Sequence, residues 1–154
     1  MAILRYSASA DTTITNAYRA DLKLRGTGSN MGYADSLEVF SIYGQTSGST
    51  GRSEELSRIL IDFPIARVIT DRAASTIPAS GSVSFYLRMF NAETPFTLPQ
   101  DFTLTVAPVS SSWTEGTGLD MDEYLDIGKA NWISSNTSTD WDYTGADFLT
   151  ASNY

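Results

Sequence analysis

The sequence predicts an all-β fold, an antiparallel jelly-roll-like β-sandwich with one or two short helices. Three observations favour this class: apolar residues recur with a period of two, turn residues separate the short apolar runs, and no run is long enough to span a membrane as a helix. With 154 residues the chain suffices for one domain with a sizeable core. We therefore expect a single sandwich domain over residues 1–154.

Five segments carry the alternation of a half-buried strand, in which one face packs on the core and the other meets solvent. These segments are residues 21–26, 36–44, 57–64, 82–90 and 101–108. In two of them the opposite face is apolar as well, so these strands are expected to lie centrally or to face a partner. The interface candidates on that second face are Phe40, Ile42, Tyr86 and Phe90.

Ten residues are predicted to form the core and the corner of the sandwich. They are Leu37, Val39, Ile59, Ile61, Phe63, Phe85, Leu87, Leu104, Val106 and Trp113. Trp132, in the strand-like run "ANWI", is expected to be a core residue as well. Trp141 lies in the polar run "NTSTDWDYTGAD", so we expect it to be exposed as an interface or sugar contact.

A first break in the period of two predicts a short helix after residue 63. Pro64 stands at a first helical position, where its missing N–H has no cost. Ile65, Val68 and Ile69 then follow at the spacing of one helix face. A helix or single helical turn is therefore expected to cross the sandwich here.

A second break is the acidic stretch 110–128, which has no basic residue. Its carboxylates are Glu115, Asp120, Asp122, Glu123 and Asp126. Asp120 and Glu123 have the spacing of a capping box, and acids are favoured in the first turn of a helix. Gly128 occupies the natural stop, beside Lys129. A short capped helix that ends near Gly128 therefore explains most of these acids.

Two chemical alternatives remain for the same stretch. An EF-hand is excluded because Tyr124 and Leu125 stand where its loop needs a ligand and a glycine, but a looser calcium site is open. The calcium candidates are Asp120, Asp122 and Asp126. A glycosidase pair is the other alternative, made of Glu115 with Asp120 or Asp122 across a cleft.

Composition narrows the chemistry further. The chain has no cysteine and no histidine, which excludes disulfides, thiol nucleophiles, His-assisted catalysis and the usual zinc ligands. An enzyme is not expected, because the capped helix explains the one candidate acid pair better than catalysis does, and no cofactor is expected either. The net charge is −8, and residues 78–154 carry ten acidic and two basic side chains. Such a chain is expected to repel nucleic acid and anionic membrane surfaces. Met1 precedes an alternating segment instead of a secretory leader, so the chain is expected to be made and kept in a cytoplasm, or to be exported by a route other than a signal peptide.

Several motifs, in order and spacing, resemble the DNRLRE-type domains. They are "ADTTI" at 10–14, "GSNMGYADSLEV" at 28–39, "RILIDFPI" at 58–65, "GSVSFYLRMF" at 81–90, "VAPVSSSWTEGTG" at 106–118 and "ANW" at 130–132. The resemblance covers roughly residues 10–135 and implies a jelly-roll β-sandwich. Such domains occur in bacterial surface and polysaccharide-associated proteins, and similar chains occur among virion proteins of marine tailed phages.

The chain departs from the family pattern where a further pair of strands is expected, because it stops at "DFLTASNY". Residues beyond Tyr154 or a neighbouring protein are expected to complete the sandwich, and the isolated chain is expected to be oligomeric or aggregated. The sequence thus favours a structural component of a tailed-phage virion, with other virion proteins and further copies as partners. The alternative is a carbohydrate-binding module of a secreted bacterial surface protein, with a surface glycan as ligand.

Overall fold

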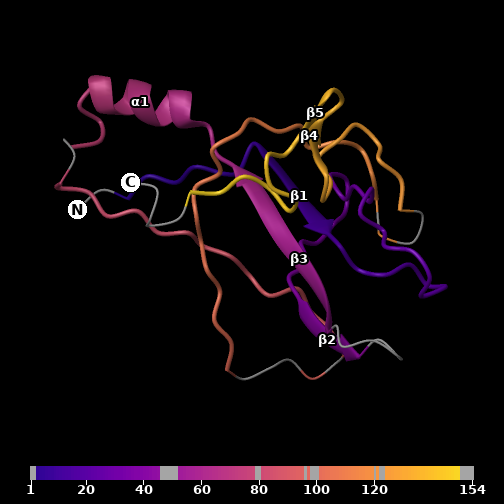
Figure 1. The fold of residues 1–154 in the computed structure, drawn as a ribbon. Helices are drawn as coiled ribbons and strands as arrows, with labels where there is room; N and C mark the ends of the chain where they lie inside the picture. Colours follow the sequence, from indigo (N-terminus) through magenta and orange to yellow (C-terminus); the bar gives the residue numbers. More distant parts are fainter. Residues whose placement is uncertain are drawn as a thin grey trace. The chain divides into compact units, whose positions relative to one another are not determined.

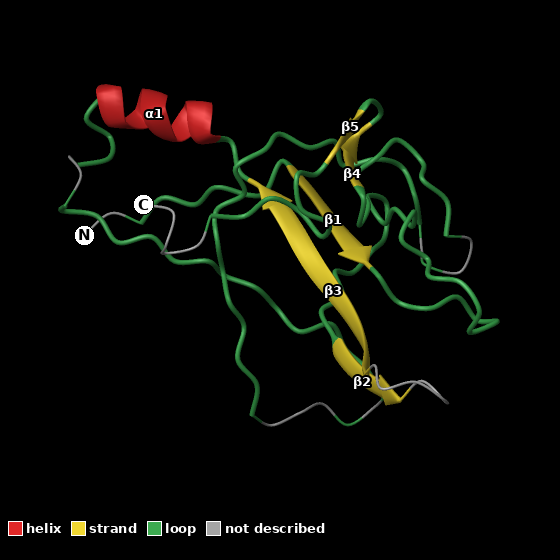
Figure 2. Ribbon diagram, in the orientation of Figure 1, coloured by secondary structure: helices red, strands yellow, loops and turns green. Residues whose placement is uncertain are grey.

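In the residues that it describes, the computed structural model shows a β-rich fold with one short helix (Figure 1; Figure 2). The structure describes residues 3–45, 52–78, 81–95, 97, 101–119, 121 and 124–149. In chain order the elements are β1 (Ala10–Thr15), β2 (Ser41–Gln45), β3 (Arg52–Asp62), α1 (Ile65–Ala73), β4 (Ser134–Asn136) and β5 (Thr139–Asp140). Within these ranges, no helix has the length and apolar character needed to cross a membrane.

The chain forms two compact units. We name residues 1–9 and 62–104 the helical unit, and residues 10–61 and 105–154 the strand unit. The helical unit holds α1, whereas the strand unit holds β1, β2, β4, β5 and nearly all of β3. The expectation of a single domain over residues 1–154 stays a prediction.

The main sheet of the strand unit has β3 at its centre, in the strand order β1-β3-β2. β2 runs antiparallel to the first half of β3, from Ser41 opposite Leu56 to Gln45 opposite Arg52. Strands were predicted in both regions, and the structure confirms their type, although β3 begins five residues earlier than the alternation indicates. β4 and β5 form a separate antiparallel pair.

The core of the strand unit gathers around two tryptophans. Its buried residues are Ile14, Leu60, Ala130, Trp132, Trp141 and Ala146, with Leu56, Val109 and Trp113 packed against them. On β3, Leu56 and Leu60 reach this core, and Arg58 of the same strand lies with its guanidinium 5.1 Å from the Trp132 ring centroid. The Arg58 Nη1 also donates a hydrogen bond to the Gly145 carbonyl oxygen. Trp113 and Trp132 therefore pack as predicted.

The prediction of buried core residues is wrong for five of the ten residues. The structure leaves five of these side chains exposed: Val39, Phe85, Leu87, Leu104 and Val106. Leu37, Ile59, Ile61 and Phe63 are half-buried. On β3 the even-numbered leucines reach the core, because a shift of one residue turns the opposite face of a strand inward.

Three predicted strands are absent from the described residues. Residues 81–95 and 101–108 form no strand. Directly after the second range, Val109 forms an isolated β-bridge with Phe148. Residues 21–26 form no strand either, and only a single bridge joins Tyr18 to Arg25 there. Alternation alone does not make a strand, because each strand also needs a neighbour to accept its ladder of hydrogen bonds.

The predicted first helix is confirmed as α1. Pro64 is its N-cap residue, and Arg72 in the last turn lies near the carbonyl end, where a positive charge is favoured. Ile65 and Ile69 of the predicted apolar face are exposed. Within the helical unit, the Tyr6 hydroxyl donates to Asp71 Oδ2 over 2.7 Å and so ties α1 to the N-terminal segment.

The predicted second helix is wrong for its described part. Residues 124–128 are not helical, and Tyr124 and Gly128 have φ values of 52° and 78°. The Thr117 amide donates to the Ile127 carbonyl over 2.8 Å, and the Asn30 main-chain amide donates to the Leu125 carbonyl over 3.1 Å, so this segment bonds to other loops instead of forming a helix. Asp120, Asp122 and Glu123, the proposed capping and calcium residues, lie outside the described residues.

Candidate functional site

The side-chain amide of Asn30, in the strand unit, is fully buried and takes part in four hydrogen bonds. Its Nδ2 donates to the carbonyl oxygens of Glu115 and Ala130, over 2.8 and 2.7 Å. Its Oδ1 accepts from the amides of Gly118 and Gly32, over 2.8 and 3.3 Å. All four hydrogen-bonding positions of the amide are therefore satisfied, as a buried polar group requires.

The glycines around Asn30 are needed for its close approach to the chain. A Cβ atom on Gly118 would collide with the Asn30 main-chain oxygen, and one on Gly116 would collide with the Asn30 side chain. Gly116 also has a φ of 83°, which other residues rarely adopt. We name the residues joined in this way, 30–32, 115–118 and 130, the Asn30 corner.

Glu115 binds β1 to the Asn30 corner. Its Oε1 accepts a hydrogen bond of 2.7 Å from the Asp11 main-chain amide. Burial, with a smaller contribution from the Glu115 charge, raises the pKa of Asp11. The partners of Glu115 in the predicted glycosidase pair, Asp120 and Asp122, lie outside the described residues. Its observed hydrogen bond is architectural, since it joins the first strand to the corner.

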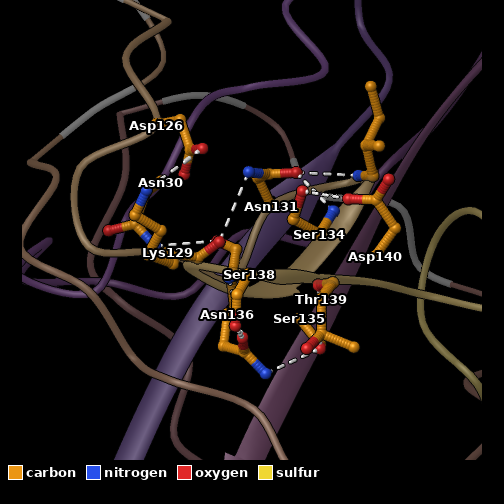
Figure 3. A network of polar contacts seen from close by, with 12 residues as sticks. Asn30, Asp126, Lys129, Asn131, Ser134, Ser135, Asn136, Ser138, Thr139 and Asp140 are labelled. Atoms are coloured by element: carbon orange, nitrogen blue, oxygen red, sulfur yellow. Dashed lines mark hydrogen bonds and ion pairs between the residues drawn. The ribbon is translucent and has the colours of Figure 1, made fainter.

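A second corner surrounds Asn131, the residue next to Ala130 in the chain. Its Oδ1 accepts from the amides of Ile133 and Ser134, both over 2.8 Å (Figure 3). Its carbonyl oxygen accepts from Trp141 Nε1, also over 2.8 Å. Trp141 was predicted to be exposed, and this is wrong: the side chain is only 5% exposed and belongs to the core. The polar residues around it in sequence bond one another at the surface, so they gave a false signal of exposure.

Asp147 is a buried carboxylate without a cationic partner among the contacts described for it. It accepts hydrogen bonds from the amides of Tyr143 and Asp142 and from the Ser111 hydroxyl, over 2.8, 3.2 and 2.9 Å. Burial on its own would raise the pKa of Asp147, but these hydrogen bonds outweigh burial and the pKa lies below its ordinary value. Sequence reasoning did not single out this residue.

The calcium candidates divide between described and undescribed residues. Asp126 Oδ2 lies 3.6 Å from Lys129 Nζ, so it forms an ion pair with the lysine that was placed at the predicted helix end. Asp120 and Asp122 are outside the described part. In the part of the chain that the structure describes, no group of three or more acidic side chains could hold a metal ion. The calcium site stays a prediction that needs the two remaining aspartates.

The four interface candidates lie in different units. In the strand unit, Phe40 is half-buried and Ile42 is exposed. In the helical unit, Tyr86 and Phe90 are 88% and 77% exposed, and the Arg88 guanidinium lies 4.7 Å from the Phe90 ring centroid. The extended segment that carries these two rings therefore presents a large apolar surface within its unit.

The sequence held a signal for the Asn30 corner that was not used to predict it. "NMG" places a glycine two residues after an asparagine, and "WTEGTG" places two glycines two residues apart. Closely spaced glycines indicate a close approach of another backbone or side chain. Asp147 left no comparable signal, because two of its three hydrogen-bond donors are main-chain amides, which any sequence provides. Comparison of the chain with protein-family models, with curated proteins and with solved structures finds no match in any of the three.

Proposed function

We propose that this chain is a structural component of a tailed-bacteriophage virion, either the anchoring domain of a tail fibre or a decoration protein of the capsid or tail. In this proposal its fold is a jelly-roll-like sandwich and its partners are other virion proteins and further copies of the same chain. It works through protein contacts, without catalysis and without a cofactor. It resides in the virion, after assembly in the host cytoplasm.

The observation that carries the proposal is the Asn30 corner. The corner joins the segments "NMG", "WTEG" with its following "TG", and "ANW", and Glu115 adds the strand that contains "ADTTI". These segments belong to four of the six motifs on which the resemblance to DNRLRE-type domains rests. Their contact in space supports a common architectural role, since residues far apart in sequence that satisfy one buried amide act as one unit.

The use of the buried polar groups also favours a scaffold. The side-chain amides of Asn30 and Asn131 form hydrogen bonds with main-chain groups. The Asp147 carboxylate accepts from main-chain amides and from one serine hydroxyl. Hydrogen bonds of this kind fix loops on a sheet and leave these groups no role in binding a substrate. The exposed rings of Tyr86 and Phe90 offer the kind of apolar surface that a partner protein covers.

A carbohydrate-binding module is the second candidate. Exposed aromatic rings are the residues that stack on sugars, and Tyr143, at 78% exposure, is one such ring in the strand unit. Trp141, the ring first considered for this role, is buried and does not contribute. The surviving candidates are therefore tyrosines and phenylalanines.

Co-expression with the proteins encoded beside its own gene tests the proposal. We expect the tagged chain to capture at least one of them stoichiometrically, and the Tyr86→Ser/Phe90→Ser variant to lose that capture. Tyr33→Ser, which removes another exposed ring, serves as the matched control. A chain that captures no such protein but is retained on a polysaccharide column would contradict the virion role and favour the carbohydrate-binding alternative.

A further inference from the structure

Residues 18–25 of the strand unit form a braced loop, which we name the basic loop. The chain runs out from the end of β1 and turns back in this loop (Figure 1). The Arg19 amide donates to the Leu24 carbonyl, and the Leu22 amide donates to the Arg19 carbonyl, both over 2.8 Å. The Lys23 amide donates to Asp21 Oδ1 over 3.0 Å. The shape of the loop is thus set by its own hydrogen bonds.

Two of its three cations are held at the base of the loop. The Arg25 guanidinium lies 4.5 Å from the Tyr18 ring centroid, and its Nη1 donates to the Asn16 carbonyl over 2.7 Å. The Arg19 guanidinium lies 5.5 Å from the ring centroid of Tyr124. These contacts anchor the base, whereas Lys23 is exposed at the tip.

The tip exposes two leucines on either side of Lys23. Leu22 is 75% exposed and Leu24 is 60% exposed. Leu22 also has a φ of 54°, a left-handed conformation that asparagine and glycine adopt far more easily than leucine. A preorganised tip that holds apolar side chains in solvent is suited to binding, because little further ordering is needed when it meets a partner.

The charges of the strand unit indicate what that partner is. Outside the basic loop, the unit carries thirteen acidic and three basic residues. Residues 130–149 contain no lysine or arginine, and Asp140, Asp142 and Tyr143 are all exposed within four residues of sequence there. Asp140 accepts from the Ser134 hydroxyl over 2.7 Å, which fixes it on the β4–β5 pair (Figure 3). We name Asp140, Asp142 and Tyr143 the acidic patch.

We propose that the basic loop of one chain docks on the acidic patch of a second copy of this chain. Lys23 faces the two carboxylates, and Leu22 and Leu24 cover the Tyr143 ring. Because loop and patch are different surfaces, the contact is heterologous and generates rings or stacks instead of closed pairs. The inference rests on the proposed function, for which it names one partner and the surfaces that recognise it.

Sedimentation velocity of the purified chain tests this contact, over about 10 to 500 μM, the affinity range suited to a small interface. We expect the wild-type sedimentation coefficient to rise with concentration. Leu22→Asn should weaken association about tenfold or more, since asparagine suits the backbone of the loop but removes its apolar contact. Leu119→Ser, which removes an exposed leucine elsewhere in the unit, should associate as the wild type does.

A charge exchange identifies the two surfaces. Lys23→Glu and Asp142→Lys should each weaken self-association, and an equimolar mixture of the two variants should restore assemblies that contain both in equal amounts. A wild-type chain that stays monomeric, association that Leu22→Asn leaves unchanged, or a mixture that fails to pair would each overturn the inference. None of these results bears on whether the chain is present in virions, so failure of the contact and failure of the proposed function are distinguishable.

Discussion

The side-chain nitrogen of Asn30 donates a hydrogen bond of 2.8 Å to the main-chain oxygen of Glu115, across 85 residues of sequence. The Glu115 carboxylate in turn accepts from the main chain of β1. The two residues therefore connect the first strand, the loop after it and the segment after Trp113. They define the corner on which the proposed structural role depends.

Replacement of Asn30 tests the corner. Asn30→Asp exchanges the donor Nδ2 for an oxygen, which would face the carbonyl oxygens of Glu115 and Ala130 in a buried site. We expect the free energy of unfolding to fall by about 3 kcal/mol or more, measured by urea denaturation.

Asn136→Asp is the matched control, because its oxygen can still accept from the Ser138 amide and its lost donor bonds only a serine hydroxyl, which can turn. It should cost less than about 1 kcal/mol. Equal losses in the two variants would contradict the central position of Asn30.

Trp141→Phe tests the burial of the tryptophan that the sequence placed at the surface. The substitution removes the Nε1 donor from the Asn131 carbonyl and leaves that oxygen buried. We expect a loss of about 1–3 kcal/mol in thermal unfolding, before any effect of packing. Tyr143→Phe, on an exposed ring, should leave the melting temperature almost unchanged. A Trp141→Phe chain as stable as the wild type would show that the indole is not held in the core.

The acid sensitivity of the fold should depend on Asp147. Because its pKa is lowered in the folded chain, its charge stabilises the fold above the unfolded pKa, and that stability is lost as the pH falls through the folded pKa. Asp147→Asn should therefore be less stable than the wild type at pH 7, and its stability should fall less between about pH 5 and pH 2.

Asp11 acts in the opposite direction, since its raised pKa adds stability as the pH falls. Asp11 is present in both the wild type and the Asp147→Asn variant. The difference between their stability curves therefore reports on Asp147 alone. Parallel stability curves for the variant and the wild type would contradict the assigned hydrogen bonds.

The proposed absence of catalysis can be checked at Glu115. Glu115→Gln keeps an oxygen to accept from the Asp11 amide, so the fold should persist while the charge is lost. We expect neither chain to release reducing sugar from polysaccharides. Sugar release by the wild type that disappears in the variant would identify Glu115 as a catalytic acid or base.

The sequence predicted those elements whose signals are local. Pro64 marks the start of α1 because its own geometry suits that position, and the alternation around β3 identifies a strand. Which face of β3 turns inward was predicted wrongly, since Ile59 and Leu60 are both apolar and only packing with Trp132 decides between them.

The remaining features depend on partners distant in sequence. Residues 82–90 alternate as a strand does, but alternation does not specify which strand accepts the hydrogen bonds. The Asn30 amide binds the main chain of residues 85 and 100 positions away, and the Asp147 carboxylate binds the Ser111 hydroxyl 36 positions away. These contacts follow from the path of the chain, which neighbouring residues do not specify.

The proposed virion role is tested most directly by mass spectrometry of phage particles that carry the gene. The particles are purified on a density gradient from a lysate of their host bacterium. We expect peptides of this chain in the particle band, in a fixed ratio to the major capsid protein, with removal only under conditions that dissociate the particle. Intact particles without these peptides, while the chain is recovered bound to the cell-surface polysaccharide, would contradict the proposal.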